Sequence, residues 1–161
     1  MPHIDSAYNL ARWLAKNEHD AQDIVQDSFV RAFTYFGSFY GNDGKAWLLA
    51  IVRNTFYSWI QKKKSRQGIE NIEELSEDHI SSEETPDLEL ETKDDQEAIR
   101  SALHSLPLEF REVIVLRELE GLSYKEIAAL MQIPIGTVMS RLARGREMLR
   151  KILEHRLNME F

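Results

Sequence analysis

The sequence predicts an all-α fold of two small helical domains joined by a flexible acidic linker, with a helix-turn-helix in the C-terminal domain. Apolar residues recur every three to four positions on both sides of the middle segment, which is the period of an α-helix. No segment shows the strict alternation of a half-buried strand, and Asp43-Gly44 precedes a helical pattern instead of joining two strands. These observations disfavour any fold class that contains β-strands.

The distribution of charge places the linker. The net charge is −7, but residues 69–97 alone carry −12, whereas residues 1–68 carry +3 and residues 98–161 carry +2. A segment this acidic and this poor in aromatic residues does not form a packed core. We therefore expect domains at residues 1–66 and 93–161, with a linker over 67–92. The two basic flanks are compatible with contact to phosphates.

Composition excludes several function classes. The 161 residues include no cysteine, no apolar run long enough to span a membrane and no signal-peptide pattern at the N-terminus. We therefore expect a cytoplasmic protein that does not insert into membranes. The five histidines are scattered, and neither GxxxxGK[ST] nor GxGxxG occurs. No metal or cofactor is expected, and an enzyme is disfavoured.

Three helices are expected in the first domain: one over residues 4–16, one that begins after Asn17 and runs to about Phe36, and one over about 45–64. Asn17 is a candidate cap for the second helix. The inward positions of the first two helices follow the helical period. They are Ile4, Ala7, Tyr8, Ala11, Leu14 and Ala15, then Ala21, Ile24, Val25, Phe29, Ala32, Phe33 and Phe36. The polar face of the second helix, which includes Asp23, Gln26 and Asp27, reads from its pattern alone as a solvated surface.

Aromatic and basic residues gather around the third helix. Trp47, Phe56 and Trp59 are expected in the core, whereas Tyr57 and two aromatics of the preceding loop, Phe39 and Tyr40, do not follow the buried stripe. Such residues beside a basic helix can stack on unpaired bases. The Lys62–Lys64 run is either a solvated helix end or part of a phosphate-binding surface.

The second domain contains the helix-turn-helix, Ser123–Arg146. A helix over 108–120, with Phe110, Val113, Ile114, Leu116 and Leu119 inward, ends at the C-cap residue Gly121. Ser123 and Glu126 form a capping box, and Pro134 separates the two helices of the motif. The second of these, from about Gly136, turns Val138, Leu142 and Leu149 inward and Ser140, Arg141, Arg144 and Arg146 outward. Such a helix lies in the major groove of DNA; a hairpin with solvated arginines is the alternative.

Two blocks of the sequence resemble one protein family. DAQDIVQDSFVRAF, followed by FGSFYGNDGKAWLLAIVRNTFYSWIQKKK, is similar to region 2 of an extracytoplasmic-function (ECF) sigma factor. LPLEFREVIVLRELEGLSYKEIAALMQIPIGTVMSRLARGREML is similar to region 4. The resemblance implies a protein that binds core RNA polymerase, directs it to promoter DNA and is controlled by an anti-sigma factor.

The resemblance also implies which residues carry out these contacts. Core polymerase would contact Asp23, Gln26 and Asp27, so their helix face would be an interface. The single-stranded −10 element would contact Phe39, Tyr40, Arg53, Asn54, Tyr57, Lys62 and Lys63. The −35 duplex would contact Arg117, Tyr124, Thr137, Met139, Ser140, Arg141 and Arg144. Met139 departs from the family, which usually has a cation there. The missing charge implies a different −35 preference or weaker binding, and an apolar contact with a thymine methyl is the third possibility.

Two other functions stay open on the sequence alone. One is a stand-alone helix-turn-helix regulator, with residues 1–66 as a partner-binding domain, which would bind specific duplex DNA without polymerase. The other is a helical adaptor that binds only proteins and would tolerate alanine at Arg141 and Arg144.

Overall fold

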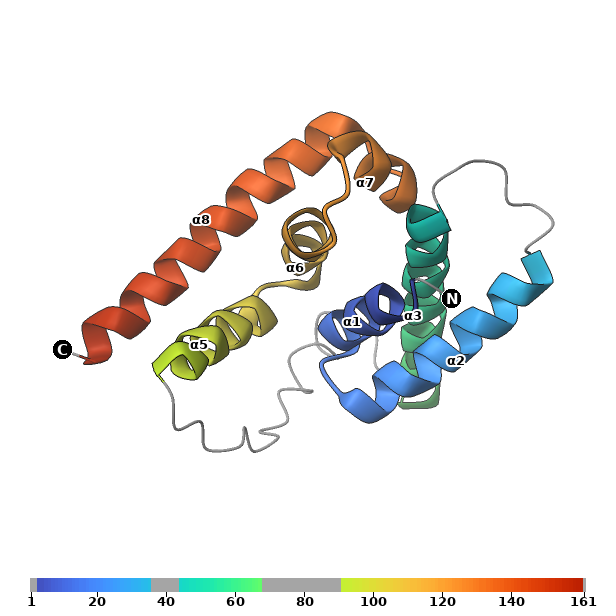
Figure 1. Cartoon of the computed structure of the whole chain (residues 1–161), viewed down its shortest axis with the longest axis horizontal. Helices are drawn as coiled ribbons and strands as arrows, with labels where there is room; N and C mark the ends of the chain where they lie inside the picture. Colours follow the sequence, from blue (N-terminus) through green and yellow to red (C-terminus); the bar gives the residue numbers. More distant parts are fainter. Residues whose placement is uncertain (1–2, 36–43, 68–90, 161) are drawn as a thin grey trace.

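Figure 1 shows the computed structural model of the chain, which describes residues 3–35, 44–67 and 91–160. Regular structure within these ranges is entirely helical, which confirms the predicted all-α class. In chain order the elements are α1 (Ile4–Ala15), α2 (Glu18–Tyr35), α3 (Gly44–Gln67), α5 (Glu91–Ser105), α6 (Leu108–Ile114), the π-helical turn η2 (Val115–Leu119), α7 (Tyr124–Met131) and α8 (Ile135–Glu160). Most of the predicted linker, residues 68–90, lies outside the described residues.

The first three helices pack on one another. α1 ends at Lys16, whose left-handed backbone (φ 61°) turns the chain so that α2 can begin two residues later. The side-chain oxygen of Asn17 accepts hydrogen bonds from the amides of His19 (2.8 Å) and Asp20 (3.2 Å). The predicted role of Asn17 as a cap is therefore confirmed.

Two predicted inward positions of these helices are wrong. Ile4 is 44% exposed because it lies in the first turn of α1, and Phe33 is 78% exposed because α2 extends past α3 before it ends (Figure 1). The helical period correctly assigns a side chain to a face, but the face is buried only where another helix covers it.

The helix before the helix-turn-helix is not a continuous α-helix. α6 passes into η2, where the amide of Glu120 donates to the carbonyl of Val115 five residues back (3.0 Å). Gly121 then adopts a left-handed conformation (φ 72°), as its predicted capping role requires. Because a π-turn holds more residues than an α-turn, the residues toward its end and after it shift around the helix axis. Leu119, expected inward, is accordingly 52% exposed.

The helix-turn-helix consists of α7 and the first turns of α8. The capping box is complete, since the Ser123 hydroxyl accepts from the Glu126 amide (3.1 Å) and the Glu126 carboxylate accepts from the Ser123 amide (2.9 Å). Gln132, at φ 57°, ends α7 in the left-handed region. Pro134 precedes the first residue of α8, and its carbonyl accepts from the amide of Thr137 (3.0 Å). The predicted motif is confirmed.

A glycine allows α8 to cross α6 closely. A Cβ atom at Gly145 would lie 2.8 Å from the Cδ1 atom of Ile114 and 3.4 Å from the Cβ atom of Phe110. Beside this crossing, Val138 and Leu142 are completely or almost completely buried. The crossing therefore sets which face of α8 points outward.

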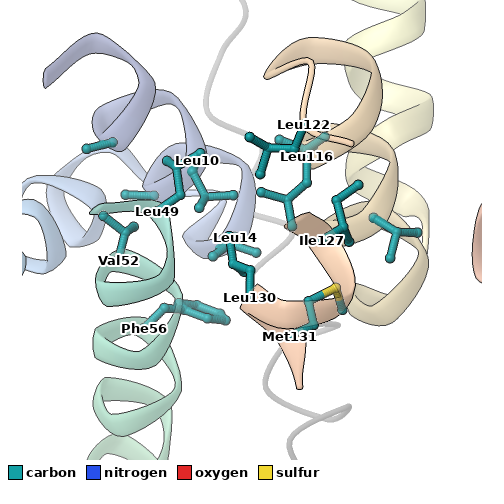
Figure 2. Close-up of a cluster of buried hydrophobic side chains, with 14 of the residues drawn as sticks. Leu10, Leu14, Leu49, Val52, Phe56, Leu116, Leu122, Ile127, Leu130 and Met131 are labelled. Atoms are coloured by element: carbon teal, nitrogen blue, oxygen red, sulfur yellow. The ribbon is translucent and has the colours of Figure 1, made fainter. Parts of the chain in front are cut away.

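The N-terminal helices (α1–α3) and the C-terminal helices (α5–α8) share one core. Figure 2 shows side chains of the two groups facing each other across their contact, which we call the seam. Those labelled are Leu10, Leu14, Leu49, Val52 and Phe56 on one side and Leu116, Leu122, Ile127, Leu130 and Met131 on the other. The most extensive packing across the seam joins α1 to α6 and η2, and α3 to α7.

Buried Arg111 ties the seam to the ends of two helices. Its Nη1 atom donates to the carbonyls of Leu106 (3.1 Å) and His104 (3.3 Å), near the end of α5. Its Nη2 atom donates to the carbonyl of Leu14, near the end of α1 (3.3 Å). A cation suits both positions because the last carbonyls of a helix lack intrahelical partners and carry partial negative charge.

Candidate nucleic-acid interface

The outer face of α8 presents a mixed polar and apolar surface. Ser140 and Arg144 are exposed and Thr137 is half-buried, above the buried anchors Val138 and Leu142. Predicted Met139 is 50% exposed. One neighbour was not predicted: Ile135, one turn before Met139, is 46% exposed. Since residues four apart share a helix face, Ile135 and Met139 form an apolar strip beside the polar positions.

Two predicted residues lie at the junction of η2 and α7. The Arg117 guanidinium lies over the Tyr124 ring, 4.6 Å from its centroid, and donates to the carbonyl of Leu122 (2.9 Å). These contacts hold both side chains beside the start of α7, the helix that crosses the phosphate backbone in such motifs. Arg146 pairs with Glu118 through two nitrogens and is not an unpaired cation of the outer face.

The basic end of α3 is partly engaged with α2. Lys63 lies 3.9 Å from the Asp20 carboxylate and 4.8 Å from the centroid of the Trp59 ring. Lys62 and Asn54 are exposed. The aromatics Phe39 and Tyr40 lie outside the described residues. Of the predicted −10 set, the structure therefore describes only the residues on α3.

Two further members of that set, Arg53 and Tyr57, contact a buried acid across the seam. Glu112 on α6 is 1% exposed, and its carboxylate accepts from the Arg53 Nε atom (2.5 Å) and from the Tyr57 hydroxyl (3.0 Å). The Arg53 guanidinium also lies 4.6 Å from the centroid of the Tyr57 ring. This group of three residues was not predicted from the sequence.

Burial dominates the electrostatics of this group. It raises the pKa of Glu112 above its usual value, against the lowering effects of Arg53, Tyr57 and the half-buried Arg141. Burial, followed by the negative charge of Glu112, also raises the pKa of Tyr57, so its hydroxyl stays protonated and donates. The charged form of Glu112 is thus stabilised by residues predicted for both DNA elements: Arg53 and Tyr57 for −10, and Arg141 for −35.

The predicted polymerase contacts occupy one face of α2. Asp23, Gln26 and Asp27 are all exposed. The same face continues toward the end of the helix with two exposed apolar residues, Val30 (66%) and Phe33 (78%). The helical pattern predicted Phe33 in the core, and this prediction is wrong. The available signal was that α2 has apolar residues on more than one face, which is typical of a helix that contacts something besides its own core.

Comparison with known proteins assigns the family. Residues 1–66 match the family described as Sigma-70 region 2, and residues 96–149 match Sigma-70, region 4. The ECF RNA polymerase sigma-E factor of Haemophilus influenzae is 36% identical over 149 residues, which cover 87% of this chain and 77% of that protein. The chain belongs to the ECF sigma factor family.

Two other similar proteins are also sigma factors. The ECF RNA polymerase sigma factor SigE of Mycolicibacterium smegmatis is 38% identical over 154 residues, and the match spans 94% of this chain but 58% of that relative. The solved structure of the sigma factor RpoE in complex with the anti-sigma factor NepR, from Bartonella quintana, superposes with a TM-score of 0.72 at 29% identity, covering 95% of this chain and 92% of that one. CnrH, solved in complex with the cytosolic domain of CnrY, has the same fold (TM-score 0.66).

No helix among the described residues is long and apolar enough to cross a membrane. In the same part of the chain, no three histidine, aspartate or glutamate side chains come together as metal ligands would.

Proposed function

We propose that this sigma factor binds bacterial core RNA polymerase and directs promoter-specific initiation of transcription. The observation that carries the proposal is the capped helix-turn-helix, in which buried Val138 and Leu142 turn Ser140 and Arg144 outward. The two matched regions, in this order on one chain, support a factor that reads two promoter elements. It works as an initiation factor in the cytoplasm, and RNA polymerase performs the chemistry.

The proposed division of work follows the two helical groups. Residues 1–66 bind polymerase through Asp23, Gln26 and Asp27 and read the opened −10 strand from α3 and from the preceding residues Phe39 and Tyr40. Residues 93–161 read the −35 duplex from α8, and residues 67–92 connect the two. An exposed arginine on a recognition helix can form a bidentate contact with guanine, which discriminates by about 1–3 kcal/mol.

Control by an anti-sigma factor completes the proposal. Its support is the Bartonella quintana relative, which was solved bound to such a protein and superposes over 95% of this chain. The exposed α2 face, with Val30 and Phe33, offers an apolar surface of the kind that protein partners cover.

Run-off transcription tests the function. The purified chain and bacterial core polymerase, on a library of genomic promoters, should give promoter-specific transcripts. Arg144→Ala should reduce them about tenfold or more through a lost base contact. Arg156→Ala is the matched control, since Arg156 is also exposed on α8 but lies beyond the helix-turn-helix. An absence of specific transcripts with active core would contradict the proposal, and specific duplex binding without polymerase would favour the stand-alone regulator.

A further inference from the structure

The first turns of α8 have two flanks of different character, on either side of the outward-facing Ser140. Successive residues of a helix are offset by about 100°, so Met139 shares one side with Ile135, four residues earlier, and with Arg146, seven residues later. Arg144 lies on the other side of Ser140. We call the surface formed by Ile135 and Met139 the apolar flank.

The apolar flank is open to a ligand, and the cation beside it is already paired. Ile135 is 46% exposed and Met139 is 50% exposed. Arg146, on the same side of α8, donates from its Nε atom to the Glu118 carboxylate (3.1 Å) and from its Nη2 atom to the same oxygen. The charge of Arg146 is therefore balanced within the protein, whereas binding to phosphates depends on cations that replace counterions. This side of α8 is suited to an apolar contact.

A glycine beside the apolar flank leaves room for DNA. Gly136 follows Ile135 on the exposed surface of α8, and a Cβ atom at Gly136 would have no neighbouring atom within 4 Å. A backbone without a side chain can approach a ligand closely. When α8 enters the major groove, Ile135 and Met139 can therefore reach the edges of the bases as well as the sugars and phosphates.

Thymine is the base whose major-groove edge matches an apolar side chain, because it presents a 5-methyl group there. The N-terminal residues of a recognition helix contact base edges, and Ile135 is the first residue of α8. Ile135 and Met139 are separated by about 6 Å along the helix axis, and base pairs are stacked about 3.4 Å apart. The two side chains therefore match thymines that are adjacent or one base pair apart.

We propose that Ile135 and Met139 are specificity-determining residues of this sigma factor, which read the 5-methyl groups of two nearby thymines in the −35 duplex. The inference rests on the proposed function, because α8 must enter the groove for the flank to meet a base. The apolar flank adjoins Ser140 on the outward face of the same helix turns, so its occupant is the promoter duplex. Arg144, on the other side, contributes a polar contact that the flank does not replace.

Uracil isolates the proposed contact, because it differs from thymine only by lacking the 5-methyl group. The complex of this chain with core polymerase selects from a library of promoter duplexes randomised at the −35 position, and competition binding then compares each selected duplex with its uracil counterpart. Selected sequences should contain the two thymines. Replacing both by uracil should weaken binding about tenfold, or about three- to fourfold for each methyl group.

Alanine variants assign each thymine to a side chain. Ile135→Ala and Met139→Ala should each lose the discrimination between thymine and uracil at one of the two positions and keep it at the other. Met139→Leu, which keeps an apolar side chain, should retain the discrimination. Leu157→Ala is the matched control, since Leu157 is 54% exposed on α8 but lies beyond the helix-turn-helix.

The possible failures separate this inference from the proposed function. Equal binding to thymine and uracil duplexes, or a selection without the two thymines, would overturn the inference. So would weaker binding of Ile135→Ala or Met139→Ala to core polymerase with unchanged discrimination, because the apolar flank would then be a protein interface. Specific transcripts from the unchanged chain in any of these cases would leave the proposed function standing. Selection of no sequence, together with no specific transcript, would contradict both.

Discussion

Gly145 provides a quantitative test of how α8 is placed. In Gly145→Ala the new methyl group would lie 2.8 Å from Ile114 Cδ1, 3.3 Å from Ile114 Cγ1 and 3.4 Å from Phe110 Cβ. Alanine favours the helix by about 1 kcal/mol over glycine, but an added methyl in a packed interior costs about 1–3 kcal/mol. Ile114 is 3% exposed and has little room to move. We therefore expect the overpacking to outweigh the gain, and Gly145→Ala to lower the free energy of unfolding by up to about 2 kcal/mol.

Urea unfolding of two further variants isolates the clash. Gly136→Ala has no neighbouring atom within 4 Å of the new methyl and should be neutral or stabilising. Ile114→Val removes the Cδ1 atom, so combining it with Gly145→Ala should recover part of the loss, although Ile114→Val alone costs about 0.5–1.5 kcal/mol. A Gly145→Ala variant at least as stable as Gly136→Ala would refute the predicted clash. So would changes in unfolding free energy that simply add when Ile114→Val and Gly145→Ala are combined.

Three further predictions concern the surface, pH and the polymerase. Met139→Lys should add one phosphate contact, steepening the salt dependence of binding to promoter duplex by about one unit in log–log slope; an unchanged slope would place residue 139 away from DNA. Burial, followed by the charge of Arg111, lowers the pKa of His104 from 6.5 to about 4. The contribution of His104 to the free energy of unfolding is therefore complete above pH 6.5 and is lost toward pH 4, by about 1–2 kcal/mol after allowance for solvent screening. In urea titrations between these pH values, His104→Gln should show a weaker pH dependence of stability than the unchanged chain. Parallel stability–pH curves for the two proteins would contradict this. Replacing Asp23 and Asp27 by lysine should weaken binding to core polymerase about tenfold at low salt in a fluorescence titration, and unchanged affinity would remove α2 from the interface.

Local rules explain what could be predicted from the sequence. The Ser123–Glu126 capping box, the Asn17 cap and the left-handed Gly121 each depend on residues within a few positions of one another. The backbone geometry at a helix end leaves few alternatives, so the residue type identifies the cap. The same reasoning placed the helix-turn-helix correctly.

Other features depend on packing that the helical period does not contain. Leu119 follows the apolar pattern of a straight helix, but the η2 turn changes its orientation. Phe33 also follows the pattern, yet no described helix covers that part of α2. Periodicity gives the direction of a side chain relative to its own helix, whereas burial is a property of two elements.

Contacts across the seam could not be predicted from the sequence either, because they join residues far apart in the chain. Glu112 and Arg53 are 59 positions apart, and each alone reads as an ordinary charged residue on a helix. Their pairing requires the fold to bring Arg53 of α3 beside Glu112 of α6, and burial then makes the carboxylate depend on that partner. A guanidinium that could bind a phosphate is equally able to bind a carboxylate of its own chain. The features that indicated DNA contacts in the sequence, a cation and an aromatic residue on α3, are therefore also the features that contact Glu112.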